Sequence, residues 1–151
     1  MASFKNFSIW QGKLPHWRAD DVTYYVTFRH SRALNEKECR LLLDELLKAD
    51  AKRLDFLIAC CLPGVTETLF TVREGPDGEA YELADVIEKA KTRAGKKILK
   101  LTEERWPPFY GESYDRIVRD DAELEERWTE ILNSPVKAEL CEDPEEYAAL
   151  Y

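Results

Sequence analysis

Few residues in this chain have the type and spacing that catalysis or metal binding requires. The two histidines, His16 and His30, are too far apart along the chain to form an i, i+2 or i, i+4 metal-binding pair. The sequence contains no GxGxxG, P-loop or GxSxG motif, and the glycines of "EGPDG" are typical of a turn. The most unusual acidic residue is Glu67, which stands between Thr66 and Thr68 in the strand-like segment "CCLPGVTETLF". The sequence therefore predicts no histidine-based metal site and leaves one carboxylate to explain.

Glu67 has two interpretations when it is considered alone. A carboxylate can bind Mg²⁺ or Mn²⁺, but a single one binds such ions weakly because hard cations need several oxygen ligands at once. A charged residue in an alternating strand is also typical of a side chain that faces solvent. The second interpretation is the more common one for a residue of this kind.

Composition predicts one cytoplasmic domain spanning residues 1–151. A chain of this length buries about two-thirds of its unfolded surface and needs no cross-links to fold. Its four cysteines form no CxxC pair, and the N-terminal segment lacks the apolar core of a signal peptide. We expect reduced thiols and, because no run approaches about 20 apolar residues, no membrane span.

Charge is distributed unevenly along the chain. The net charge of −8 argues against a protein that coats nucleic acid, because phosphate binding requires a basic face. One segment differs from the rest: residues 89–105 contain seven Lys or Arg and only two Glu. The pattern indicates an acidic body that carries one basic helix.

Hydrophobic periodicity predicts the secondary structure. Strands are expected at residues 22–29, 54–62 and 65–74, with a short fourth at 114–118. A helix should begin at Asn35, with Glu38 completing a capping box, and a second should span 82–101. A third helix is expected at 120–133, ended by Pro135, and a short terminal helix capped by Asp143. The order predicts an α+β, ferredoxin-like antiparallel sheet with helices packed on one face.

Several motifs in order resemble one known family. They are "LPHWR", "YYVTFR", "CCLPGVTETLF", "RWPPFYGESYDRIVRDDAEL", "WTEILNSPVKAEL" and "EDPEEY". Together, over residues 14–147, they resemble the REP-associated tyrosine transposases of the insertion-sequence-200-like branch of the HUH nucleases. The resemblance implies a ferredoxin-like fold and nicking of single-stranded DNA beside a hairpin. In that family, a divalent metal polarises the phosphate and a tyrosine attacks it.

The residues that would perform this reaction are replaced in the present chain. The family's two metal-binding histidines correspond to Val65 and Glu67, and its nucleophilic tyrosine and nearby asparagine correspond to Glu130 and Ser134. Val65 has no lone pair, and Glu130 would repel a phosphodiester anion. We therefore expect no catalytic residues, no bound Mg²⁺ or Mn²⁺, and no nuclease activity by the family mechanism. Tyr110 and Tyr114 could serve as replacement nucleophiles, but Tyr114 is more favoured as a packing residue beside the structural pair Asp115 and Arg116.

The protein could retain DNA binding although the catalytic residues are replaced. The resemblance implies that the basic helix lies near DNA, and His16 and Trp17 match a second motif that could touch it. The candidate DNA-binding residues are Lys89, Lys96, Lys97, Lys100, Arg116 and Arg119. The basic stretch is equally consistent with an ordinary solvated helix face. Two functions thus remain open: binding of single-stranded or hairpin DNA, or an acidic protein-interaction module without DNA binding.

Overall fold

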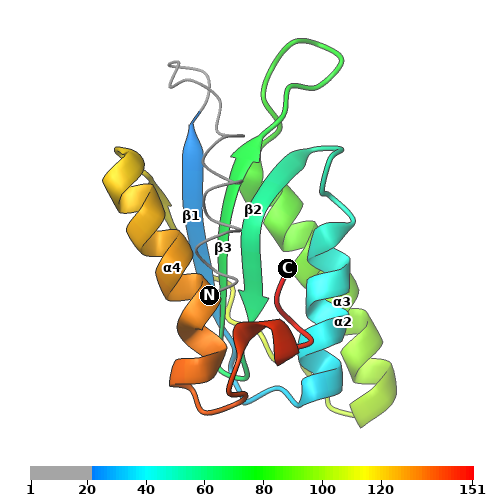
Figure 1. The fold of residues 1–151 in the computed structure, drawn as a ribbon. Coiled ribbons are helices and arrows are strands. Elements are labelled where there is room, and N and C mark those ends of the chain that lie inside the picture. The colour runs from blue at the N-terminus through cyan, green and yellow to red at the C-terminus, as the bar shows by residue number, and fades with distance from the viewer. Residues whose placement is uncertain (1–21) are drawn as a thin grey trace.

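The computed structural model describes residues 22–151, which form a four-stranded antiparallel sheet with helices packed against it (Figure 1). The strands are β1 (Thr23–Arg29), β2 (Leu54–Cys61), β3 (Val65–Val72) and β4 (Tyr114–Ile117), in the spatial order β2-β3-β1-β4. The helices are α2 (Glu36–Leu47), α3 (Leu83–Thr102) and α4 (Asp121–Lys137), followed by the short 3-10 turn η1 (Pro144–Glu146). The α+β class and the predicted order of elements are confirmed.

The expectation that the helices share one face is wrong for α4. Val26 and Phe28 of β1 pack with α2 and α3, whereas Tyr25 faces the opposite side and packs with α4. Figure 1 shows α4 on one side of the sheet and the α2–α3 pair on the other. Because neighbouring residues of β2 and β3 are also apolar on both sides, each face of the sheet needs a cover.

Local signals position α2 and α3. The capping box of α2 is formed by Asn35 and Glu38, as predicted. Arg32 then joins the start of α2 to the end of α3 by binding both Glu38, at 2.6 Å, and Glu104. Gly95 lies where α3 meets the segment before β4, and a Cβ there would come within 2.9 Å of Pro107. A glycine in mid-helix is therefore required by close approach of the two segments.

The C-terminal part of the chain differs from the prediction in two ways. Helix α4 does not stop at residue 133 but continues through the buried Pro135 to Lys137. A proline within a helix removes one backbone donor, and burial of its ring against the fold compensates for that loss. The predicted terminal helix is only the turn η1, capped by Asp143, after which the last residues run alongside β2. The amide of Tyr151 donates to the Ala59 carbonyl at 2.8 Å, so the chain covers part of its own sheet edge.

Two further features of the described residues bear on the predictions. No helix within residues 22–151 is long and apolar enough to cross a membrane. All four cysteines are unpaired, and Cys39, Cys60 and Cys61 are buried. Burial raises the pKa of the Cys39 thiol to about 11, which makes it unreactive at neutral pH.

Candidate functional site

The alternation of β3 explains why a carboxylate stands between two threonines. Thr66 and Thr68 are fully buried on the α2–α3 side, where the Thr68 hydroxyl donates to the Val26 carbonyl at 2.8 Å. Glu67 points to the opposite side, toward α4. It is not an ordinary solvent-facing residue, because its carboxylate is held by residues from two other elements.

Glu67, Ser134 and Tyr25 form a polar cluster between the sheet and α4, which we call the Glu67 cluster. The Ser134 hydroxyl lies 2.7 Å from one carboxylate oxygen of Glu67, and the Tyr25 hydroxyl donates to the other at 3.4 Å. The same Ser134 oxygen lies 2.8 Å from the backbone carbonyl of Glu130, one turn earlier on α4. The single hydroxyl hydrogen can serve only one of these acceptors at a time. The structure thus brings together Glu67, Glu130 and Ser134, three of the four positions that the motif comparison singled out.

Arg127 completes the edge of the Glu67 cluster. Its guanidinium lies 4.6 Å from the centre of the Tyr25 ring, and one of its nitrogens lies 3.6 Å from the Glu130 carboxylate. Burial raises the pKa of Tyr25 to about 12, and the charges of Glu67 and Glu130 add to that effect while Arg127 opposes it. The phenol therefore stays protonated at neutral pH. Sequence analysis missed Tyr25 and Arg127, and only the pairing of β1 with β3 places Tyr25 near Glu67.

Val65 and His30 do not extend this cluster into a metal site. Val65 is partly buried and packs against the apolar residues beneath α4. His30 lies on the other side, with its ring nitrogens 2.8 Å from the Pro63 carbonyl and 2.9 Å from the Thr66 hydroxyl. Burial lowers the pKa of His30, so the ring is neutral and fills a structural role. Among residues 22–151, no group of three or more His, Cys, Asp or Glu side chains is placed to hold a metal ion.

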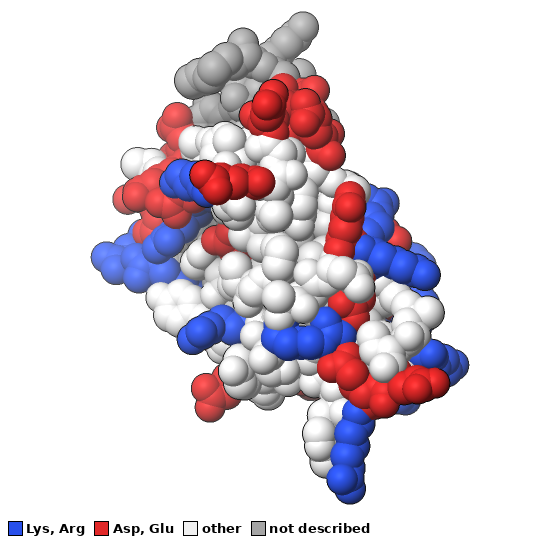
Figure 2. Space-filling model, turned by 90° about the horizontal axis from the view of Figure 1, so that it is seen from below, with Lys and Arg blue, Asp and Glu red and all other residues white. Residues whose placement is uncertain are grey.

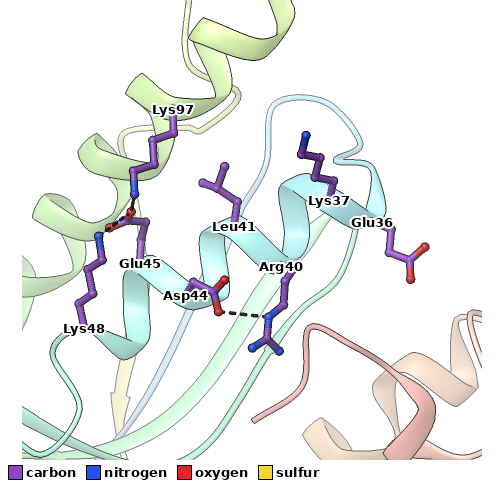
Figure 3. A pocket seen from close by; sticks show the side chains of 8 residues that line it. All are labelled: Glu36, Lys37, Arg40, Leu41, Asp44, Glu45, Lys48 and Lys97. Atoms are coloured by element: carbon purple, nitrogen blue, oxygen red, sulfur yellow. Dashed lines mark hydrogen bonds and ion pairs between the residues drawn. The ribbon is translucent and has the colours of Figure 1, made fainter.

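The candidate DNA-binding lysines of α3 fall into two groups. The side chains of Lys89, Lys96 and Lys100 are exposed and form no hydrogen bond or ion pair with another residue of the described range 22–151. Lys97 instead forms an ion pair with Glu45 of α2, a side chain that is only 1% exposed. Figure 3 shows Lys97 and Lys48 converging on this carboxylate from the two helices.

Glu45 keeps Lys97 engaged within the fold. Burial by itself raises the pKa of Glu45, but hydrogen bonds from Lys97, Lys48 and Arg93 outweigh it and lower the pKa to about 2. The carboxylate is thus ionised at all ordinary pH values. Lys97 is consequently less available to a phosphate than its helical neighbours are.

The remaining basic candidates also differ in availability. The guanidinium of Arg116 lies 2.7 Å from the Glu123 carboxylate, whereas Arg119 is exposed. Lys91 is only 4% exposed and donates to the Tyr110 carbonyl at 2.8 Å, which anchors α3 to the segment before β4. His16 and Trp17 lie outside the described residues.

The end of the molecule at the bottom of Figure 1 carries a mixed surface. Figure 2 shows Lys and Arg side chains interspersed with Asp and Glu over most of this end, with one denser group of Asp and Glu near the top of the view. Any DNA contact on this end would therefore depend on a few free cations.

Comparison with solved structures identifies the fold. No protein-family model and no curated protein sequence matches this chain. A structure of a REP-associated tyrosine transposase bound to a REP hairpin matches with a TM-score of 0.64 and 13% identity, covering 86% of this chain and 76% of that one. A protein described as a transposase of Deinococcus radiodurans R1 matches with a TM-score of 0.53 and 11% identity, covering 78% of this chain and 94% of that one. The chain therefore has the fold of the REP-associated and related transposases, as its motifs predict.

Proposed function

We propose that this protein derives from a REP-associated tyrosine transposase, no longer cleaves DNA, and binds single-stranded or hairpin DNA in a salt-sensitive manner. One observation carries the proposal: the side chains that meet between β3 and α4 are Glu67 and Ser134, with Glu130 alongside. The motif comparison expects imidazoles, an amide and a nucleophilic phenol at these positions. The fold and the ordered motifs support the ancestry.

The chemistry of the Glu67 cluster argues against phosphodiester cleavage. A carboxylate at position 130 would repel the phosphate it had to attack. The Tyr25 phenol, with a pKa of about 12, is a weak nucleophile at neutral pH. Arg127 already lies against the Tyr25 ring and the Glu130 carboxylate, so a phosphate would have to compete with Glu130 for its charge. The proposed function requires neither Mg²⁺ nor Mn²⁺.

The exposed lysines of α3 support DNA binding. Lys89, Lys96 and Lys100 occupy the solvent side of the helix, where they can each displace counterions from a phosphate. The REP-associated neighbour was solved with a REP hairpin, which makes a nucleic-acid hairpin the natural first ligand to test. The unpaired, buried thiols fit a reducing compartment, and we propose a cytoplasmic location.

Cleavage is tested with a labelled single-stranded oligonucleotide that contains a hairpin, incubated with Mg²⁺ or Mn²⁺. We expect neither a nicked product nor a covalent protein–DNA adduct on a denaturing gel. The quadruple variant Val65→His, Glu67→His, Glu130→Tyr, Ser134→Asn tests whether the fold still supports the reaction when the family residues are restored. This variant should form the covalent adduct. An adduct with the unaltered protein would overturn the proposed loss of activity.

Binding is tested by mobility shift at low salt with the same DNA. The double variant Lys96→Glu, Lys100→Glu should weaken binding about tenfold or more, because four units of charge change next to phosphate. The double variant Lys37→Glu, Lys52→Glu is a matched control, since it makes the same charge change at exposed residues of other segments. Equal losses in the two variants would indicate a general charge effect and contradict the proposed surface.

A second function, an acidic protein-interaction module, is favoured by the net charge of −8. It predicts no mobility shift at micromolar protein even at low salt. In that case, Lys89, Lys96 and Lys100 would only form the solvent-exposed face of α3.

A further inference from the structure

A groove opens beside the Glu67 cluster, between the end of β1 and the segment that leads into β4. It is lined by residues 27–29 and 110–114 and has a volume of about 780 Å³. We call it the tyrosine groove, because Tyr110 and Tyr114 both line it and are 52% and 56% exposed. Two exposed aromatic rings that line one groove form a surface suited to contact with a flat ligand.

Both tyrosines are attached to backbone that the fold holds in place. The buried ammonium of Lys91 binds the Tyr110 carbonyl at 2.8 Å and lies 5.0 Å from the centre of the Phe28 ring. Tyr114 belongs to β4, and its ring contacts the Tyr25 ring edge-on, with centroids 6.4 Å apart. The rings are therefore presented by anchored segments, which lowers the entropy cost of binding a flat ligand.

The groove continues directly from the Glu67 cluster. Tyr114 pairs with Thr27 across β4 and β1, and Thr27 pairs with Glu67 across β1 and β3. These three side chains therefore lie in one row on the same face of the sheet. The groove therefore lies at the β4 end of this row, two strands away from Glu67.

The charged residues of the groove indicate which ligand it suits. Arg29 is exposed and has no ion-pair partner among residues 22–151, so its guanidinium is available to a phosphate. Glu112 also lines the groove and, as a carboxylate, only accepts hydrogen bonds. A phosphate beside Arg29 would pair with its guanidinium, whereas the charge of Glu112 would oppose a phosphate placed near it.

We propose that the tyrosine groove binds one unpaired base of single-stranded DNA, stacked on Tyr110 or Tyr114, with Arg29 on the adjoining phosphate. The inference rests on the proposed DNA-binding function and names the residues that would make it selective for single strands. Bases within a duplex are already stacked on each other and present no free face to a tyrosine. Stacking also tolerates every base, so strand state rather than sequence would govern affinity.

The experiment measures fluorescence anisotropy with a labelled single-stranded DNA oligonucleotide of about 20 nucleotides, its duplex, and the RNA of the same sequence. The double variant Tyr110→Ala, Tyr114→Ala should weaken single-strand binding about five- to tenfold and leave duplex binding unchanged, and at least one of the two single variants should show the same loss. Tyr110→Phe and Tyr114→Phe should bind as the unaltered protein does, because the ring faces remain. Glu112→Gln should tighten binding by removing a negative charge.

A second readout reports stacking directly. A single-stranded oligonucleotide that carries one 2-aminopurine should change its fluorescence on binding, and Tyr110→Ala with Tyr114→Ala should abolish that change. Tyr151→Ala is the matched control, since Tyr151 is 51% exposed but lies at the β2 edge.

The outcomes separate this inference from the proposed function. If the lysine variants lose binding but the tyrosine variants do not, the proposed role of the tyrosine groove is wrong. The proposed DNA-binding function would still stand. Absence of any binding by the unaltered protein would overturn both. Equal affinity for single-stranded RNA would retain the stacking site and remove the preference for DNA.

Discussion

The charged side chains on the two faces of the sheet differ in their partners. On the α2–α3 side, the buried charges have opposite partners: Glu38 binds Arg32, and Glu45 binds Lys97, Lys48 and Arg93. On the α4 side, Glu67 contacts only neutral hydroxyl groups, those of Ser134 and Tyr25. Removing one partner of a buried ion pair destabilises a fold because the other charge is left uncompensated, whereas Glu67 depends on no such pair. The difference indicates that the α2–α3 side maintains the scaffold and that the Glu67 cluster on the α4 side is held by neutral contacts.

The largest effect should come from the apolar core of the α2–α3 side. Phe70 is fully buried, and its ring packs against the rings of Tyr24 and Phe56. Phe70→Ala should lower the free energy of unfolding by about 3–5 kcal/mol, measured by urea denaturation. Ile131→Ala, from the core under α4, should cost about 2–5 kcal/mol. A much smaller loss for Phe70 than for Ile131 would contradict the assignment of the scaffold to the α2–α3 side.

The next effect tests the compensated charge at Glu45. Glu45→Gln should cost about 2 kcal/mol at pH 7, because three cations lose their partner, although those cations are themselves partly exposed. The folded-state pKa of about 2 lies below the unfolded value, so this stability is present above about pH 4.5 and is lost as the pH falls toward 2. Unfolding curves across that range should show a smaller acid-induced loss for Glu45→Gln than for the unaltered protein. Parallel pH profiles would show that Glu45 does not contribute.

A smaller effect is expected at the Glu67 cluster. Ser134→Ala should lower the free energy of unfolding by about 1 kcal/mol, because it removes the 2.7 Å contact with Glu67. The double variant Ser134→Ala, Glu67→Gln should cost little more than Ser134→Ala alone, since the two residues share one interaction. Additive losses measured by urea denaturation would show that the contact contributes no coupling.

The smallest expected effect is on the Tyr25 hydroxyl. Tyr25→Phe removes only a 3.4 Å hydrogen bond and should change stability by about 0.5 kcal/mol or less. Glu67→Gln should lower the pKa of Tyr25 from about 12 without returning it to the usual value, because burial is the largest cause of the shift. An NMR titration of the labelled tyrosine ring measures this directly. An unchanged pKa would mean that the charge of Glu67 does not contribute to the raised pKa of Tyr25.

Much of the fold could be predicted because its signals are local. The capping box of α2, the alternation of β1 and the apolar stripe of α3 each depend on residues within a few positions of one another. Predictions failed where distant residues decide the outcome. Pro135 remains within α4 because its ring is buried, and the last residues extend along β2 because that edge has free backbone groups.

The site could be predicted only in part. The motif comparison identified Glu67, Glu130 and Ser134, and the structure places them together. It did not identify Tyr25 or Arg127, and it treated Lys97 as equivalent to Lys96. Helical spacing places two lysines near one side of α3, but only the packing of α2 decides that Glu45 binds one of them.

The sequence by itself determined the helices and strands, their order, and which residues stand at the positions that the motifs single out, namely Val65, Glu67, Glu130 and Ser134. These follow from residue identity and short-range spacing. Only the tertiary structure decided that α4 covers the second face, that Tyr25 reaches Glu67, and which lysines remain free. Those outcomes depend on strand register and on packing between segments far apart in the chain, for which no short stretch of sequence carries a signal.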